Sequence, residues 1–329
     1  MSASIKDVAK LAGVSIATVS RVINKNVYVK EETTRKVLDA IEKTGYKPNA
    51  IARSLKVKNT RSIGIIIPDI SSHFFPDVVR GIEDVANEYN YNIILCNTDL
   101  DRDKEKKYFD VLVEKQVDGI VYMSNTITEE IANKIASVGI EIVLISTDYK
   151  DLTSVTVDNI KAAEDAVKYI ISKGYRDIAF IGGEMTDPNA GLPRFNGYIK
   201  ALSEAGISIN KDFILEGNYR YESGYEGAKK LLSLDNRPQA VFAASDEMAV
   251  GVIRAALEQG YRIPEELAVV GFDNVDISKM VYPPLTTISQ PLYEMGCEGM
   301  KLLARKINKE KIEKYKVVLK HNVIERQSC

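Results

Sequence analysis

Two short amphipathic segments joined at Gly13 occupy residues 5–24, and they set the narrowest limit on what this chain can fold into. Apolar residues recur at helical spacing in both segments: Ile5, Val8, Ala9 and Ala12 in the first, and Val19, Val22 and Ile23 in the second. Gly13 supplies a tight turn, and Ser15 is a good N-cap for the second helix. The pattern predicts a helix-turn-helix.

The second helix should present a polar face opposite its apolar side. The N-terminal half of such a helix enters a DNA major groove, where Arg21 can pair with guanine, Ser20 with a base or phosphate, and Ile16 or Ala17 with thymine methyl groups. The alternative is an ordinary helical hairpin with a solvated polar face. The candidate DNA-binding residues in this region are Ser15, Ile16, Ala17, Thr18, Ser20, Arg21 and Asn24.

Charge is distributed unevenly along the chain. Residues 1–61 carry nine Lys and four Arg against five acidic residues, whereas the remaining 268 residues carry 31 basic and 41 acidic residues. A basic module attached to an acidic body is typical of nucleic-acid binding, because neutralising phosphates supplies much of the affinity and makes it salt-dependent. The acidic body itself should not bind DNA.

A third helix is expected over residues 31–44, ending at Gly45, and a short helix should start at Pro48-Asn49. This last segment can be a plain linker. The functional alternative is a hinge helix that inserts Leu55 into the minor groove and brings Arg53, Lys56 and Lys58 near phosphates.

From Ser62 onward, short β-branched runs alternate with helical stretches. The predicted strands are Ile63–Pro68, Asn92–Cys96, Gly119–Met123, Ile142–Ser146, Ile178–Ile181, Ala240–Ala244 and Val269–Phe272, with a last strand-like stretch at Lys316–Ile324. This alternation predicts parallel sheets covered by helices on both faces. Several strands end in polar clusters, and ligands bind outside the carboxyl ends of strands in such sheets. Two sets of these clusters suggest two lobes that face a shared cleft.

The chain resembles the lactose/galactose-repressor family of bacterial transcription regulators from Ile5 to about Arg326. The matching stretches are Ile5–Ala9, Gly13–Ser15, Thr18–Asn24, Gly45–Asn49, Ala52–Leu55, Ser245–Gly251 and Gly271–Asn274. The resemblance implies a headpiece with hinge helix (residues 1–60) and a two-lobed, periplasmic-binding-protein-like α/β core. Its first lobe would comprise residues 61–161 and 292–326, and its second lobe residues 162–291.

The resemblance also implies a small-molecule effector in the cleft. The expected effector-binding residues are Asp69, Ser72, Phe74, Ser124, Asp158, Arg194, Tyr219, Asp246 and Asp273. Carboxylates can accept hydrogen bonds from hydroxyl groups, Arg194 can hold an anionic group, and aromatic rings can cover a sugar. A sugar phosphate such as fructose-1,6-bisphosphate or glucose-6-phosphate would suit this set. Local roles remain as alternatives, with Asp246 and Asp273 as helix caps and Phe74 as a core residue.

Within the family the chain is most similar to the carbon catabolite control subgroup of Gram-positive bacteria, through Gly81–Ala86, Tyr91–Leu95, Lys115–Val121 and Pro291–Glu294. This similarity implies a partner, the serine-phosphorylated phosphocarrier protein HPr. The matching surface residues are Asp69, Asp77, Asp84, Tyr89, Tyr293, Glu294 and Lys301. Lys301 and Asn322 stand where the subgroup carries arginines, which weakens recognition of a phosphoserine. Arg194 follows the wider family instead, so the alternative is a repressor of one sugar- or nucleobase-utilisation operon controlled only by a ligand in the cleft.

Other classes of protein fit the sequence poorly. The sequence has no phosphate loop, G-x-S-x-G, H-E-x-x-H or G-x-G-x-x-G motif, and its two histidines have no metal-ligand partner at motif spacing, so neither an enzyme nor a metal site is expected. A sugar-binding protein without a regulatory role is disfavoured because no secretory signal precedes the helix pair. No apolar run approaches the roughly 18 residues of a membrane span. Cys96, Cys297 and Cys329 suit a reducing cytoplasm. A two-fold homodimer on a near-palindromic operator is expected.

Overall fold

The computed structural model of the protein describes residues 3–24, 28–46 and 60–329. It contains two compact units, Met1–Thr60 and Arg61–Cys329. The predicted hinge residues Arg53, Leu55, Lys56 and Lys58 lie outside the described residues.

The N-terminal unit contains three helices around a small apolar core: α1 (Ile5–Ala12), α2 (Ile16–Asn24) and α3 (Glu31–Thr44). Gly13 ends α1 in the left-handed conformation with φ 66°, and Gly45 ends α3 with φ 63°. The Ser15 hydroxyl accepts a hydrogen bond of 3.1 Å from the Thr18 N–H at the start of α2. The predicted helix-turn-helix, its Ser15 cap and the third helix are therefore confirmed.

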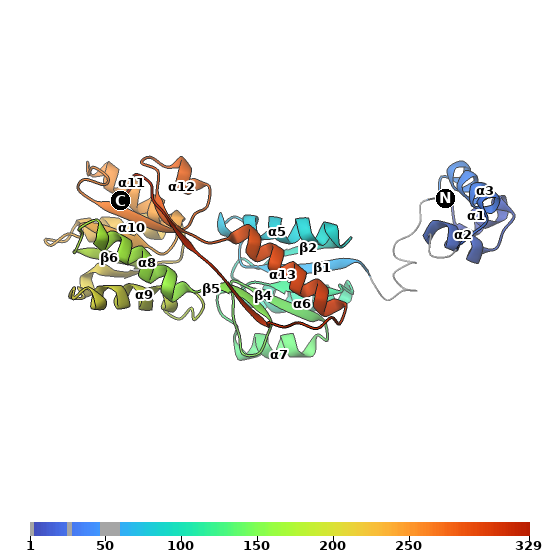
Figure 1. Ribbon diagram of the computed structural model, residues 1–329, viewed down its shortest axis with the longest axis horizontal. Coiled ribbons are helices and arrows are strands. Elements are labelled where there is room, and N and C mark those ends of the chain that lie inside the picture. Colours follow the sequence, from blue (N-terminus) through green and yellow to red (C-terminus); the bar gives the residue numbers. More distant parts are fainter. Residues whose placement is uncertain (1–2, 25–27, 47–59) are drawn as a thin grey trace. The chain divides into compact units, whose positions relative to one another are not determined.

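The second unit contains two six-stranded sheets, shown in Figure 1. The first sheet has the order β11-β5-β4-β3-β1-β2 and consists of β1 (Ser62–Ile67), β2 (Asn92–Asn97), β3 (Gly119–Tyr122), β4 (Glu141–Ile145), β5 (Ser154–Val157) and β11 (Lys316–Leu319). The second has the order β12-β10-β9-β8-β6-β7 and consists of β6 (Ile178–Gly182), β7 (Ile214–Glu216), β8 (Ala240–Ala243), β9 (Ala268–Asp273), β10 (Thr286–Ser289) and β12 (Asn322–Ile324). Neighbouring strands run parallel, except that β12 is antiparallel to β10. The predicted parallel α/β class is confirmed.

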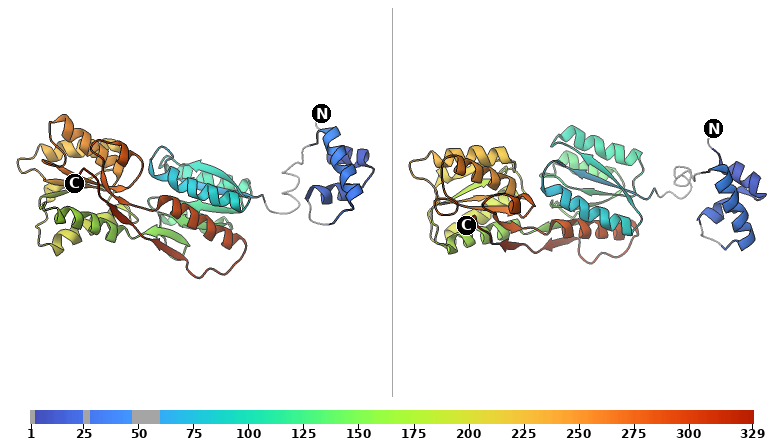
Figure 2. Two further views of the ribbon diagram at one scale, coloured as in Figure 1. Left: turned by 45° about the horizontal axis from the view of Figure 1, so that its top comes forward. Right: turned by 90° about the horizontal axis from the view of Figure 1, so that it is seen from above.

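Helices cover both faces of each sheet (Figures 1 and 2). We call the first sheet with α5 (Phe74–Glu88), α6 (Arg102–Glu114), α7 (Glu129–Ser137) and α13 (Leu292–Ile307) the first lobe. The second sheet with α8 (Asn159–Ser172), α9 (Gly191–Glu204), α10 (Tyr221–Leu232), α11 (Asp246–Glu258) and α12 (Ile277–Met280) is the second lobe. In the first sheet, Ile63, Ile65 and Ile67 pack under α5 and α13, whereas Ile66 faces the core beneath α6 and α7. Because side chains alternate along a strand and helices cover both faces of the sheet, the side chains on both faces are buried.

The chain crosses between the lobes more often than the sequence indicated. After β10 it returns to the first lobe as α13, which lies beside α5 in Figure 2. The predicted single strand Lys316–Ile324 is two strands, β11 in the first sheet and β12 in the second. Placing all of residues 292–326 in the first lobe was therefore wrong for β12. Each half contains apolar residues, so the local pattern does not reveal a change of sheet between them.

Strands β5, β7 and β10 were not predicted. They are three or four residues long, and β5 and β10 mix Ser and Thr with their apolar residues, so they lack the continuous apolar run that marks the other strands. Pairing with neighbouring strands, rather than their own pattern, makes them strands: β5 and β10 each lie between two strands, and β7 pairs with β6 at the edge of its sheet.

Candidate functional site

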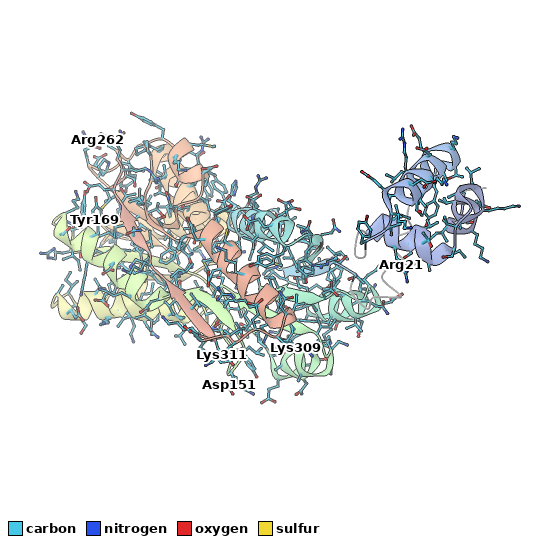
Figure 3. The ribbon with its side chains drawn as sticks, turned by 45° about the vertical axis from the view of Figure 1, so that its right-hand side comes forward. Arg21, Asp151, Tyr169, Arg262, Lys309 and Lys311 are labelled. Carbon is cyan, nitrogen blue, oxygen red and sulfur yellow. The ribbon has the colours of Figure 1, made fainter. Side chains whose placement is uncertain are left out.

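The outer face of α2 is the candidate DNA-contacting surface. Val19 and Val22 point into the headpiece core, while Ile16, Ala17 and Arg21 are exposed and Thr18 and Ser20 are half-buried. Figure 3 shows Arg21 on this helix. Ser15 caps the helix and its hydroxyl lies 2.9 Å from that of Thr18. The side chain of Asn24 lies outside what the structure describes.

The second candidate site is a pocket between the two lobes of the core. It is lined by segments that follow β1, β2, β3 and β4 in the first lobe and β6, β7, β8 and β9 in the second. Seven of the predicted effector-binding residues lie in its wall: Asp69, Ser72, Phe74, Ser124, Arg194, Tyr219 and Asp273. The cleft is thus where parallel-sheet topology places ligand sites, at the carboxyl ends of the strands.

Arg194 of α9 is buried at the base of this pocket. Its Nε donates to Asn159 Oδ1 at 2.9 Å, and its Nη1 donates to the Ala244 carbonyl at 2.6 Å. The guanidinium carbon lies 3.7 Å from the centre of the Phe272 ring, and Nη1 lies 3.9 Å from Asp273 Oδ1. A buried guanidinium held this way is pre-oriented to donate to a ligand.

Asp273, the last residue of β9, is the carboxylate beside Arg194. Burial raises its pKa to about 7, although Arg194 and the 2.7 Å hydrogen bond from Gln290 Nε2 act in the opposite direction. The Oε1 atom of Gln290 is buried without a hydrogen-bond partner among the described residues. Asp273 can therefore accept or donate hydrogen bonds near neutral pH.

Tyr219, which was predicted from the sequence, forms a hydrogen-bonded pair with Asp187, which was not. The Tyr219 hydroxyl donates to Asp187 Oδ2 at 2.8 Å, and Asp187 Oδ1 also accepts from the N–H groups of Asn189 and Ala190. Burial raises the pKa of Tyr219, so it remains a hydroxyl donor. A Cβ at Gly183 would overlap the Tyr219 ring, so this position requires a glycine. The Asp187-Pro-Asn189 cluster after β6 was the available signal.

Two predicted effector residues do not line the pocket. Asp158 is exposed and caps α8 by accepting from the Lys161 N–H at 2.9 Å. Asp246 is fully buried behind the pocket, where it accepts from the Val275 N–H at 2.9 Å and from the Thr287 hydroxyl. Burial and the neighbouring Asp273 raise the pKa of Asp246. Predicting them as cleft residues was wrong, because a carboxylate after a strand can equally cap the next helix or tie two strands.

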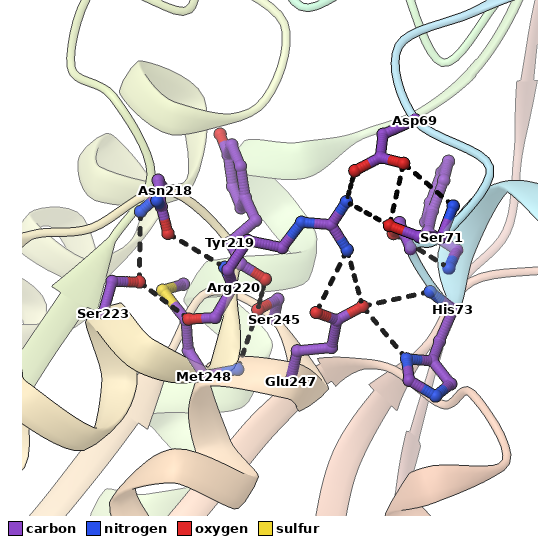
Figure 4. Close-up of polar contacts among 12 residues, drawn as sticks. Asp69, Ser71, His73, Asn218, Tyr219, Arg220, Ser223, Ser245, Glu247 and Met248 are labelled. Carbon is purple, nitrogen blue, oxygen red and sulfur yellow. Dashed lines mark hydrogen bonds and ion pairs between the residues drawn. The ribbon is translucent and has the colours of Figure 1, made fainter. Parts of the chain in front are cut away.

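Polar contacts also connect the lobes across the pocket. Asn189 of the second lobe donates to the Asn125 carbonyl at 2.9 Å and accepts from the Asp148 N–H at 2.8 Å. Elsewhere in the pocket wall, Arg220 lies between Asp69 and Glu247, as Figure 4 shows. Glu247 also accepts from the N–H of His73 at 3.0 Å. Arg220 and Glu247 were not predicted, since nothing local links them to Asp69.

The predicted partner-binding residues fall in two places. Asp84 of α5 accepts from the Tyr293 hydroxyl of α13 at 3.0 Å. Asp77, Tyr89, Glu294 and Lys301 are exposed on the same two helices or directly after α5, whereas Asp69 is ion-paired to Arg220 in the pocket wall.

In the described ranges, no three His, Cys, Asp or Glu side chains are grouped so that they could hold a metal ion. None of the helices described is both long and apolar enough to traverse a bilayer.

Comparison with known proteins agrees with this geometry. The model of the lacI family of bacterial regulatory proteins matches residues 4–49, and that of the periplasmic binding protein-like domain matches residues 167–329. The HTH-type transcriptional regulator RegA of Clostridium saccharobutylicum is 48% identical over 330 residues, covering 100% of this chain and 99% of the relative. Catabolite control protein A of Priestia megaterium is 44% identical over the same length and coverage.

Among solved structures, the lac repressor dimer bound to operator and the anti-inducer ONPF is similar with a TM-score of 0.89 and 25% identity, covering 100% of this chain and 99% of that one. These relatives are transcription regulators and not enzymes. With a helix-turn-helix headpiece, a two-lobed core and full-length identity of this degree, the chain belongs to the lacI family of bacterial regulatory proteins and is a DNA-binding transcriptional regulator similar to catabolite control protein A.

Proposed function

We propose that the protein binds a near-palindromic operator as a homodimer and that a small ligand in the pocket between the lobes changes its affinity for that operator. The observation that carries the proposal is the polar pocket, whose wall is supplied by both lobes of a chain that also bears a DNA-contacting helix. A ligand that touches both lobes binds one arrangement of them better than another. That difference is what allosteric control requires.

The pocket favours a ligand with several hydroxyl groups. Its carboxylates Asp187 and Asp273 can accept from hydroxyls, Arg194 can donate, and Phe74 and Tyr219 offer ring faces. A sugar phosphate such as glucose-6-phosphate or fructose-1,6-bisphosphate would additionally need an arginine. Arg194 and Arg220 both lie near carboxylates, so a neutral sugar fits with less rearrangement.

Serine-phosphorylated HPr is the second proposed control. Support comes from the similarity to catabolite control protein A and from the exposed α5–α13 face with Asp77, Glu294 and Lys301. Lys301 offers a point charge to a phosphate, which makes a weaker contact than an arginine fork.

Fluorescence anisotropy tests these alternatives directly. A labelled catabolite-response-type operator with a central CG step would be titrated with protein alone, with each sugar phosphate or a neutral sugar, and with phosphorylated HPr. Tighter binding with HPr supports control by that partner, and a response to a sugar alone supports the pocket. Operator binding that none of these compounds changes contradicts both proposed controls.

Arg21→Ala tests the reading helix. Loss of a bidentate contact to guanine should cost about 1–3 kcal/mol on the operator and little on random DNA. Lys36→Ala is the matched control, because Lys36 pairs with Glu32 on α3. Equal losses for Arg21→Ala on operator and random DNA would remove Arg21 as a base-reading residue.

Asp273→Ala tests the pocket. The variant should lose the response of operator affinity to the effector and keep its dimer mass, since Asp273 lies in the pocket wall. A retained response would place the effector elsewhere, and Asp273→Asn separates loss of charge from loss of packing.

A further inference from the structure

Four side chains form a chain of contacts that crosses between the lobes twice. Arg220, at the start of α10, bonds Asp69 of the first lobe through Nη2 and Glu247 of its own lobe through Nη1, at 3.3 Å from each carboxylate oxygen. Glu247 in turn accepts from the N–H of His73 at 3.0 Å and lies 3.1 Å from its Nδ1. Figure 4 shows the guanidinium between the two carboxylates. We call Asp69, His73, Arg220 and Glu247 the Arg220 network.

The network is built to hold its geometry. Glu247 lies in the first turn of α11, where the helix dipole favours a carboxylate. Asp69 is fixed by the N–H and hydroxyl of Ser71, at 2.9 and 2.8 Å. The side chains of Arg220 and Glu247 are only 25% and 13% exposed, so solvent screens their interaction less than that of a surface pair.

We propose that the Arg220 network is a latch that holds the two lobes closed before an effector binds. Its inter-lobe bonds, Asp69 to Arg220 and His73 to Glu247, exist only while the lobes are together. The affinity of any ligand for the closed pocket then depends on how much of the free protein is already closed. The latch concerns the ligand-free protein, so it stands or falls independently of which effector the pocket takes.

Hydrogen–deuterium exchange of the full-length, ligand-free protein reads this closure at two amides. The His73 N–H is bonded within the network, and the Asp148 N–H is bonded to Asn189 in the separate inter-lobe contact. Arg220→Gln removes the charge and keeps a polar side chain with hydrogen-bond donors. We expect both amides to exchange about fivefold faster, which corresponds to about 1 kcal/mol in the open-to-closed equilibrium.

The control variant is Arg262→Gln, because Arg262 pairs with Glu266 within one short segment of the second lobe. It should leave both amides unchanged. Faster exchange at His73 alone would overturn the proposal, since it would mean that Arg220 supports a local contact without closing the lobes. Unchanged exchange at both amides in Arg220→Gln would overturn it as well.

Two further amides separate opening from unfolding. Tyr91 donates to the Ala86 carbonyl within the first lobe and Ala268 to the Gln239 carbonyl within the second, and both should keep their wild-type rates. If Arg220→Gln also speeds exchange at Tyr91 and Ala268, the salt dependence of exchange in the wild type provides the test. Raising salt from about 0.05 to 0.5 M should speed exchange at His73 and Asp148 in the wild type by screening the ion pairs. If salt has no effect on exchange at His73 and Asp148, the proposed latch is overturned.

Discussion

Asp273 and Asp246 show how the presence of a cavity gives two buried carboxylates different roles. Arg194 and Asp273 lie in the pocket wall, where a ligand can replace part of their contacts. Asp246 lies behind them, and its carboxylate oxygens accept hydrogen bonds from the Thr287 hydroxyl and the Val275 N–H. A buried carboxylate whose bonds are all internal stabilises the strands around it, whereas one beside a cavity is available for binding.

The raised pKa of Asp273 predicts a pH dependence of stability. In the unfolded chain an aspartate has a pKa of about 4, whereas in the folded protein the pKa of Asp273 is raised to about 7. The folded state therefore binds more protons between these values, so its stability falls as pH rises through this window and levels off above it. Asp273→Asn should reduce the fall, and a tenfold change in proton affinity corresponds to about 1.4 kcal/mol.

Urea unfolding of Asp273→Asn and the wild type between about pH 4.5 and 7.5 checks this, since the difference in bound protons between the unfolded and folded states sets the slope of stability against pH. The exposed Asp212→Asn serves as the control. Identical slopes for wild type and Asp273→Asn would mean that Asp273 ionises normally.

Helices α5 and α13 show what determines packing at the level of elements. They lie side by side on the first sheet although more than 200 residues separate Asp84 from its partner Tyr293. Two glycines permit the close approach: a Cβ at Gly81 would meet the carbonyl oxygen of Tyr293, and one at Gly296 would meet that of Val78. The pair carries most of the proposed HPr surface, so its geometry positions that surface.

Gly81→Ala should destabilise the protein by about 1–3 kcal/mol, because the new methyl group forces two backbones apart. Denaturant unfolding measures the loss. Gly227→Ala is the matched control, since a Cβ there would meet only the side chain of Ile181. Equal losses in the two variants would show that the α5–α13 contact can relax.

At the scale of the whole molecule, the two lobes are joined by several crossings of the chain and by polar contacts over the pocket. The two strands after α13 belong to different sheets, β11 to the first and β12 to the second. A motion of one lobe against the other must therefore change the backbone between these two strands. Under the proposed function, ligand binding between the lobes and DNA binding by the headpiece are two events on one chain. Each must then change the affinity for the other by the same factor.

The proposed operator complex requires two chains, since a near-palindromic site presents two half-sites. Sedimentation equilibrium should give a mass near twice 36.6 kDa. A mass near four chains would contradict the dimer, and a mass of one chain at operator-binding concentrations would contradict the proposed symmetry.

The sequence by itself determined the local structure. Gly13 and Ser15 act on their immediate neighbours, so the turn and cap of the helix-turn-helix could be predicted, and Arg21 follows from which side Val19 and Val22 occupy. The long apolar strands could also be predicted, because a strand that is buried on both faces has a continuous run of apolar residues. Strand ends meet at one edge of each sheet, so the polar clusters with Asp69, Ser124 and Asp273 could be expected beside a cleft. Arg194 and Tyr219 were expected there only because the family resemblance implies it.

Only the tertiary structure decided which groups far apart in the sequence meet. Asp69 and Arg220 are 151 residues apart, and no local pattern encodes their contact. The same holds for the change of sheet between β11 and β12 and for the burial of Asp246 behind the pocket. Local propensity depends on neighbours within a few residues, whereas ion pairs, sheet membership and burial depend on where the whole chain brings each residue, and this is set by the packing of the complete fold.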